Sequence, residues 1–277
     1  MSDYAVSRSL TPYEESALLW YMGAPNGLFT EGLNDVAAKA KKVYVTINSL
    51  LGIDRAESDR FLEGKKQTPE LVTMEGIKKI FELIEIIYKC RDGADIQVPK
   101  LVRLARVSEM NEGTEVSSAL RSATKLPAKE CMALGYGDKN GLAICEYELA
   151  PGSVHFDYER LGEKYAKSEE REVLIASGNT LETKFVGYSK EFTGRDGIPA
   201  ALYTVKVSPC SDYDPDFEQR YQGMVFNEST IALVQEYYKE LNEKIGTEFY
   251  TPVSPSWYFF WKDVLRRLLI NHVHKFY

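Results

Sequence analysis

The chain has 277 residues, of which 44% are hydrophobic and 27% are charged. This composition is ordinary for a folded globular protein, and the length allows one large domain, alone or with extensions. The 41 acidic residues outnumber the 34 basic ones and leave a net charge of −7, which argues against a general affinity for nucleic acid or for an anionic membrane. No apolar run approaches the roughly 18 residues of a membrane span. Residues 1–4 also lack the basic start of a secretory signal, so we expect a soluble protein.

The cysteines and histidines of the sequence are few. The four cysteines (Cys90, Cys131, Cys145 and Cys210) do not have the spacing of a metal site or of a disulfide framework. We therefore expect free thiols in a reducing cytosol. The chain has only three histidines, two of them close to the C-terminal end, so we predict no metal site.

The first part of the chain, residues 1–95, is predicted to be helical. Thr11 and Glu14 form a capping box around Pro12, which predicts a helix that ends at Gly23. A second helix is expected over 34–51. A third is expected over 69–88, where isoleucines and a phenylalanine recur at helical spacing.

Short segments rich in β-branched residues follow and predict an all-β core of sandwich type within residues 96–208. The candidate strands are 100–107, 116–122, 142–149, 172–176, 183–188 and 200–207. Turn residues such as Pro151-Gly152 separate them. Helical insertions are expected over 128–134 and 158–166.

The last part, residues 209–277, is predicted to return to helices over 228–244 and 256–275. The second of these carries Trp257, Phe259, Phe260 and Trp261 among other apolar residues. This broad apolar surface either packs onto the β core or serves as a dimer or partner surface. With these helices on both sides of a β core, the predicted fold class is α+β.

Two glutamates stand two residues apart at the start of an apolar strand. Glu170 and Glu172 flank Arg171 and precede Val173. Residues two apart in an extended strand point to the same side, so both carboxylates could line one cleft. Such a pair could stabilise an oxocarbenium-like cation and accept a proton from a nucleophile. The same spacing at Glu146 and Glu148 is a reminder that a Glu-x-Glu pair is also common on a solvated strand.

Two further segments add candidates. Arg103 lies near the middle of a predicted strand, where a half-buried guanidinium needs an anion such as a pyrophosphate. The alternative is a surface arginine on an edge strand. Ser122 and Thr124 end another candidate strand, and their hydroxyls could approach a ligand or hold a carboxylate rotamer. The alternative is an ordinary turn rich in Ser and Thr.

The order of these motifs resembles that of arginine-directed mono-ADP-ribosyltransferases: an arginine, a Ser-x-Ser/Thr motif, then Glu-x-Glu followed by Val-Leu and a hydrophobic residue. The stretch from Ser122 to Gly178 is especially similar to the short enzymes of T-even bacteriophages and to the catalytic domains of bacterial binary and insecticidal toxins. The segment from Leu10 to Asn34 also resembles the helical start of the toxin domains. The resemblance covers about residues 10–190.

The resemblance implies a split β-sandwich with NAD, a substrate, in its central cleft and flanking helices. Arg103 would hold the NAD phosphates, Ser122 would orient Glu172 and contact the nicotinamide-side ribose, and Thr124 would complete that motif. Glu172 would bind the ribose 2′-hydroxyl and stabilise the cation as nicotinamide leaves. Glu170 would position and deprotonate the acceptor guanidinium.

The resemblance also implies that a loop over 159–169, with Tyr165 as its aromatic residue, would contact the target protein. One departure is Leu104, which stands where the family has Gly. This substitution makes Arg106 a rival of Arg103 for the phosphate role.

The setting implied by the resemblance is the cytoplasm of an infected or target cell, where the protein would modify arginines of host proteins. It could be packaged in a virion or made after infection. Two alternatives stay open: an NAD glycohydrolase with water as the acceptor, and a non-catalytic binding or structural module on the same fold.

Overall fold

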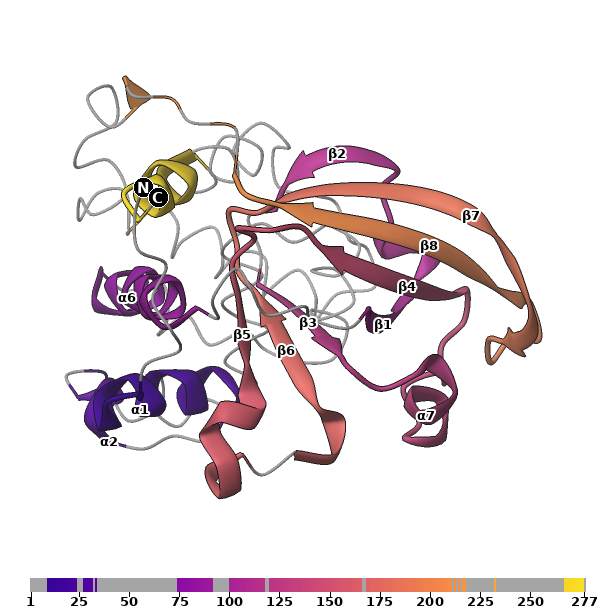
Figure 1. Ribbon diagram of the computed structural model, residues 1–277, viewed down its shortest axis with the longest axis horizontal. Helices are drawn as coiled ribbons and strands as arrows, with labels where there is room; N and C mark the ends of the chain where they lie inside the picture. Colours follow the sequence, from indigo (N-terminus) through magenta and orange to yellow (C-terminus); the bar gives the residue numbers. More distant parts are fainter. Residues whose placement is uncertain are drawn as a thin grey trace. The chain divides into compact units, whose positions relative to one another are not determined.

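The computed structural model describes residues 9–23, 27–31, 33, 74–91, 100–117, 120–165, 168–210, 212, 214, 216–217, 232 and 267–276. The chain divides into two compact units (Figure 1). We call the one that contains Cys90–Ser211 the sheet unit. We call the one that contains Ser9–Lys89 and Asp212–Tyr277 the helical unit. The helices expected over 34–51 and 228–244 lie outside the described residues, apart from position 232.

The helices and 3-10 turns have the following bounds: α1 Pro12–Tyr21, α2 Gly27–Thr30, α6 Met74–Cys90, η2 Val107–Glu109, α7 Ala128–Ala133, η3 Tyr158–Lys164 and η4 Ser168–Glu170. The strands are β1 Leu101–Arg106, β2 Gly113–Val116, β3 Arg121–Thr124, β4 Leu142–Leu149, β5 His155–Asp157, β6 Glu172–Ile175, β7 Thr180–Thr193 and β8 Pro199–Ser208.

In the helical unit, helix α1 begins with the predicted capping box. The Thr11 amide donates to the Glu14 carboxylate at 2.9 Å, and the Glu14 amide donates to the Thr11 hydroxyl at 3.3 Å. These bonds satisfy two amides that the first turn of a helix cannot pair internally. The helix ends before Gly23, whose φ of 80° suits glycine.

The C-terminal residues 267–274 are helical and pack against α6 within the helical unit. The rings of Phe81 and His272 lie edge to face with centroids 5.4 Å apart, and Nε2 of His272 lies 2.9 Å from Oε1 of Glu85. The aromatic residues 257–261, on which the prediction of a partner surface depended, lie outside the described residues.

The eight strands of the sheet unit form one sheet in the order β2-β7-β8-β4-β1-β3-β6-β5. Neighbouring strands are antiparallel except for the parallel pair β4 and β8. Helices together with a mostly antiparallel sheet make the fold α+β, as predicted. The junction between β1 and β3 is the weakest in the sheet, because its register contains the single pair Val102↔Thr124. In Figure 1, β3, β5 and β6 run away from β4, β7 and β8 at this junction.

Most predicted strands are confirmed, but the one over 116–122 is wrong. Val116 ends β2, which pairs with β7, whereas Arg121 and Ser122 begin β3, which pairs with β6. The Ser117 amide still donates to the Asn179 carbonyl at 2.8 Å, directly beyond the last pair of β2 and β7. The short strand β5 was not predicted, and the helix expected over 158–166 is instead the 3-10 turn η3.

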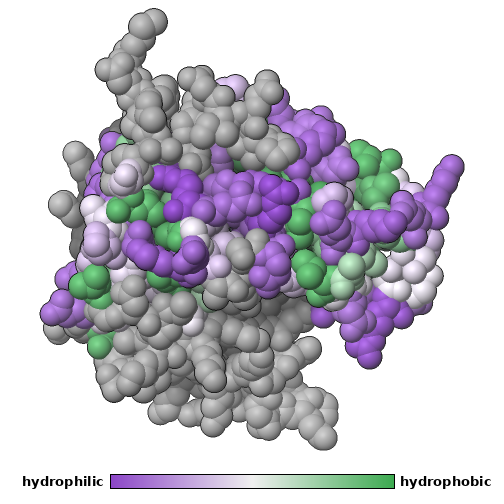
Figure 2. Space-filling model, turned by 60° about the horizontal axis from the view of Figure 1, so that its bottom comes forward, coloured by the Kyte–Doolittle hydropathy of each residue, from purple (hydrophilic) through white to green (hydrophobic). Residues whose placement is uncertain are grey.

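Both faces of the sheet are covered by apolar side chains. One core holds alternate residues of β1, β4 and β8, including Leu101, Tyr147 and Val205. The other packs Leu104 and Ile144 against residues of α7. The four cysteines are buried, and none forms a disulfide with another. Beyond the cores, Figure 2 shows a mostly hydrophilic surface, interrupted by hydrophobic patches toward the end that carries the β7–β8 ribbon, where Val186 and Ile198 are exposed.

Asn179 ties β5 to the end of β6 and provides a test of this fold. It is fully buried, and its side chain makes three hydrogen bonds to backbone atoms: with the amide and carbonyl of Val154 and with the carbonyl of Ala176. Asn179→Ala should lower the free energy of unfolding by about 3 kcal/mol, because buried backbone groups lose their partners. Urea unfolding measures this loss. Asn111→Ala, at an exposed position, should change the stability by less than about 0.5 kcal/mol; equal losses in both variants would contradict this role for Asn179.

Candidate active site

The Glu172 carboxylate lies at the centre of the site and is 6% exposed. Glu172 is the first residue of β6 and pairs with Thr124 of β3. The Ser122 hydroxyl, on the same face of β3, donates to Oε1 of Glu172. The Tyr165 hydroxyl donates to Oε2 at 3.3 Å. Each carboxylate oxygen therefore accepts a hydrogen bond from an uncharged hydroxyl, and the two bonds together fix the rotamer of the carboxylate.

Glu170 lies near the same site, but its backbone is not the extended strand that its spacing predicted. The expectation that both glutamates extend from one strand is wrong, because Glu170 ends the turn η4 and Arg171 has a φ of 44°. That left-handed conformation costs a residue with a side chain about 1 kcal/mol. It is held in part by the Thr124 hydroxyl, which donates to the Glu170 carbonyl at 2.5 Å.

Two tyrosines connect the carboxylates. Burial raises the pKa of Tyr136 above its ordinary range, and so do a hydrogen bond to Glu170 and the charges of Glu170 and Glu172. Burial likewise raises the pKa of Tyr165, and the negative charges of Glu172 and Glu170 raise it further. Both carboxylates thus lie close enough to act on both phenols, which is what an acid–base pair in one cleft requires.

Tyr165 does not have the exposed position expected of a residue that contacts a target protein. It is 3% exposed and stacks on Tyr158 with ring centroids 5.4 Å apart. Tyr136 was not among the predicted site residues. The available signal was its place in Gly135-Tyr136-Gly137, because an aromatic residue between two glycines directly after a helix is exposed on a tight turn.

Arg103 occupies the opening between β1 and β3. Its Nη1 donates to the Ser122 carbonyl at 2.9 Å, and the guanidinium is half-buried. The side chain thus satisfies a carbonyl in the region where the two strands separate. Arg106, also half-buried, lies three residues further along β1 and pairs with Leu142 of β4. Side chains alternate along a strand, so Arg103 and Arg106 leave β1 on opposite faces.

A third cation, Lys139, joins these arginines and was missed by the sequence analysis. Its Nζ donates to the Leu104 carbonyl at 2.7 Å. Burial lowers the pKa of Lys139, and the nearby positive charges of Arg103 and Arg106 lower it further. Arg103 and Lys139 bring two positive charges near one another, as a site for a polyanion would require, whereas Arg106 leaves the opposite face of β1. A lysine in the glycine-bounded turn Gly137-Asp138-Lys139-Asn140-Gly141 was the available signal.

The second Glu-x-Glu pair has a different environment. The side chains of Glu146 and Glu148 on β4 are 50% and 55% exposed, and both pair with Lys100 at 3.4 and 3.3 Å. They form a solvated surface, as the alternative interpretation of such a pair expected. The described residues contain no group of three or more His, Cys, Asp or Glu side chains that could hold a metal ion. None of the described helices is long and apolar enough to cross a membrane.

Solved structures of ADP-ribosylating toxins resemble this fold. The toxin BECa of a binary enterotoxin of C. perfringens, solved with NADH, has a TM-score of 0.41 and 14% identity, over 72% of this chain and 44% of its own. The chain therefore spans less than half the length of that component. An ADP-ribosyltransferase from Clostridium botulinum has a TM-score of 0.38 and 12% identity, over 71% of this chain and 88% of its own. The C3larvin toxin from Paenibacillus larvae has a TM-score of 0.37 and 12% identity, over 72% and 89%. No protein-family model and no curated protein matches the sequence. The resemblance to bacteriophage enzymes stays a prediction.

The raised pKa of Tyr165 predicts a loss of stability at alkaline pH. Below the ordinary tyrosine pKa of 10.0, the phenol is protonated in both the folded and the unfolded protein. Above pH 10 only the unfolded protein ionises at this residue, so the free energy of unfolding falls as pH rises toward the folded pKa. Tyr165→Phe should therefore flatten the decline in stability above pH 10, measured by urea unfolding. Tyr188→Phe, at a position 64% exposed, should leave the decline as steep as in the wild type; the same slope in Tyr165→Phe would contradict the assignment.

Proposed function

We propose that this protein is an NAD-dependent mono-ADP-ribosyltransferase that transfers ADP-ribose to arginine residues of a protein and releases nicotinamide. The observation that carries the proposal is the buried Glu172 carboxylate, which accepts hydrogen bonds from Ser122 and Tyr165. The charges of Glu170 and Glu172 both raise the pKa values of Tyr136 and Tyr165. Two cations, Arg103 and Lys139, lie on the neighbouring strand and turn, where the charge of Arg103 acts on Lys139. A dinucleotide with a pyrophosphate and a scissile glycosidic bond needs both features in one site.

The cations supply the site for the NAD pyrophosphate. A guanidinium binds two phosphate oxygens at once through its planar fork, whereas a lysine contributes a point charge. We assign the fork to Arg103, because its guanidinium is already within hydrogen-bond distance of the Ser122 carbonyl, beside the hydroxyl that holds Glu172. Lys139 adds positive charge near the phosphates, and Arg106, on the other face of β1, stays the rival of Arg103 for the phosphate role. The expected contacts of Ser122 and Thr124 with the substrate belong to the same proposal.

Glu172 assists the departure of nicotinamide. When the bond between ribose C1′ and the nicotinamide nitrogen breaks, its electrons leave with nicotinamide and positive charge develops on the ribose. A negative carboxylate with fixed geometry in a poorly solvated place stabilises that charge without having to reorganise. In this proposal, Glu172 accepts a hydrogen bond from the ribose 2′-hydroxyl and faces the developing cation. Ser122 and Tyr165 keep its rotamer in place.

Glu170 serves the acceptor. A guanidinium has a pKa above about 12 and is a poor nucleophile while protonated. As one of its nitrogens forms a bond to C1′, a proton must leave that nitrogen, and in this proposal the Glu170 carboxylate accepts it. This division assigns cleavage of NAD to Glu172 and transfer to Glu170. The acceptor is expected to be a host protein in the cytoplasm of an infected or target cell.

The division of roles predicts different losses in two conservative variants. Glu172→Gln should abolish both nicotinamide release and labelling of protein, because the stabilising charge is lost. Glu170→Gln should abolish transfer to arginine but leave measurable hydrolysis of NAD, because water needs less help to give up its proton to the solution. Labelled NAD and a host-cell lysate measure transfer, and chromatography of nicotinamide measures cleavage.

The second glutamate pair provides a matched control. Glu146→Gln and Glu148→Gln remove charges of the same spacing from a solvated strand and should leave both activities unchanged. Nicotinamide release by the wild type without labelled protein would favour the glycohydrolase. Failure of the wild type to bind or cleave NAD would favour the non-catalytic binding or structural module.

The assignment of the phosphate fork predicts the order of two affinity losses. Arg103→Lys keeps the charge but removes the fork, so it should weaken NAD binding by about tenfold or more, equivalent to about 1.4 kcal/mol. Arg106→Lys should have a smaller effect if Arg106 contributes charge alone. Isothermal titration of NAD into each variant measures both constants. A larger loss of NAD affinity in Arg106→Lys than in Arg103→Lys would assign the phosphate fork to Arg106.

A further inference from the structure

An ionic network surrounds the residue between the two glutamates. The Lys125 side chain, 11% exposed, pairs with Asp157 and with Glu159 at 2.8 Å. The other oxygen of Glu159 accepts from Nε of Arg171 at 2.9 Å. The same Glu159 carboxylate thus joins the residue that follows β3 to the residue that precedes β6.

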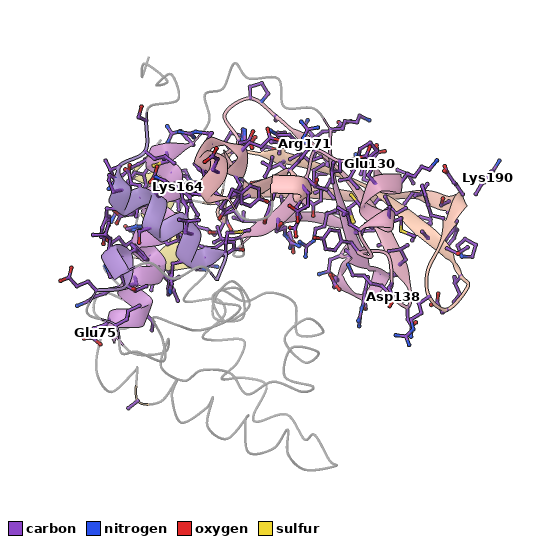
Figure 3. The ribbon with its side chains drawn as sticks, turned by 90° about the horizontal axis from the view of Figure 1, so that it is seen from below. Glu75, Glu130, Asp138, Lys164, Arg171 and Lys190 are labelled. Carbon is purple, nitrogen blue, oxygen red and sulfur yellow. The ribbon has the colours of Figure 1, made fainter. Side chains whose placement is uncertain are left out.

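The network is closed by the backbone. The Lys125 amide donates to the Arg171 carbonyl at 3.2 Å, so Lys125 holds Arg171 directly through its amide and indirectly through Glu159. The Glu159 amide in turn donates to Oδ1 of Asp157 at 3.0 Å, which fixes the start of η3. In Figure 3, Arg171 is labelled at the outer edge of the ribbon, in the neighbourhood of Glu130 of α7, whose charge also acts on it.

The charges of the network stabilise one another. Hydrogen bonds from Lys125 and then Arg171 lower the pKa of Glu159. Burial acts to lower the pKa of Lys125, but its bonds to Asp157 and Glu159 outweigh burial and raise it. The side chains of Arg171 and Glu159 are 50% and 40% exposed, and Lys125 is the buried member. Several charges joined in this way hold their geometry better than an isolated surface pair.

The two glutamates depend on this network to different extents. Glu172 belongs to a paired strand, and its carboxylate has two donors of its own. Glu170 lies before the left-handed Arg171, so its place relative to Glu172 changes with any rotation of the backbone at Arg171. Arg171 is the residue that Glu159 and Lys125 hold.

We propose that Lys125, Glu159 and Arg171 form an ionic latch that keeps Glu170 in register with Glu172, and so sets how ADP-ribose is divided between a guanidinium acceptor and water. This inference rests on the proposed function. Arg171 and Glu159 are positioning residues here, since they act through Glu170. When the latch is loosened, the bond between C1′ and nicotinamide still breaks beside Glu172. The guanidinium then has no aligned carboxylate to accept its proton, so water attacks C1′ in its place and gives free ADP-ribose.

The test uses the full chain with NAD, in the presence and absence of agmatine as a small guanidinium acceptor. Arg171→Asn removes the cation but tolerates the left-handed backbone, and Glu159→Gln removes the central charge. Both variants should lower transfer to agmatine by about 10- to 100-fold, as expected for a misplaced catalytic group, while nicotinamide release without agmatine stays close to the wild-type rate. Arg171→Lys, which keeps the charge, should restore most of the transfer.

Glu182→Gln provides the matched control, because it breaks the surface pair between Glu182 and Lys184 at 2.6 Å on β7 and should change neither rate. Thermal unfolding establishes that each variant is folded. Equal loss of transfer and hydrolysis in Arg171→Asn, or no change in either, would overturn the latch while leaving the transferase in place. A wild type that neither releases nicotinamide nor modifies agmatine would overturn the proposed function, and the latch with it.

Discussion

The pairing of β3 with β6 is the constraint on which the site depends. It sets Thr124 opposite Glu172 and Ser122 opposite Leu174. Because residues two apart on a strand share a face, Ser122 lies on the same face of the ladder as Glu172. Its hydroxyl donates a hydrogen bond to the Glu172 carboxylate. The backbone ladder thus performs the positioning, and the side-chain hydrogen bond completes it. A shift of one residue in this register would turn Ser122 and Glu172 to opposite faces and separate them.

The junction between β1 and β3 differs from that ladder, because one register pair joins the two strands. Arg103 bridges them, since its guanidinium donates to the Ser122 carbonyl. The guanidinium therefore has a structural role in the free protein. Lys139, in the turn after α7, feels the charge of Arg103.

Identical spacing leads to different chemistry at the two Glu-x-Glu pairs. Glu146 and Glu148 extend from a regular strand to solvent, where Lys100 neutralises them. Glu170 and Glu172 are separated by a left-handed residue and enclosed by two tyrosines whose pKa values they raise. Environment distinguishes a site from a solvated surface, and spacing does not. The ionic latch around Arg171 is part of that environment, because it uses residues from the end of β3, from η3 and from the segment before β6.

The sequence by itself determined what depends on neighbours along the chain. The capping box at Thr11, the alternation of β4 and the apolar run of β6 are local patterns, and the α+β class follows from their order. It also identified Glu172, Glu170, Ser122 and Arg103 as candidates, through the order of motifs that resembles a known family. Tertiary structure alone decided the ladder between β3 and β6, the opening beside Arg103, the burial of Tyr165, and the places of Tyr136 and Lys139. These features depend on contacts between residues distant in sequence, and no local periodicity carries that information. The segment after Val116 illustrates the reason: β2 pairs with β7 and β3 pairs with β6, so one apparent strand divides between distant partners.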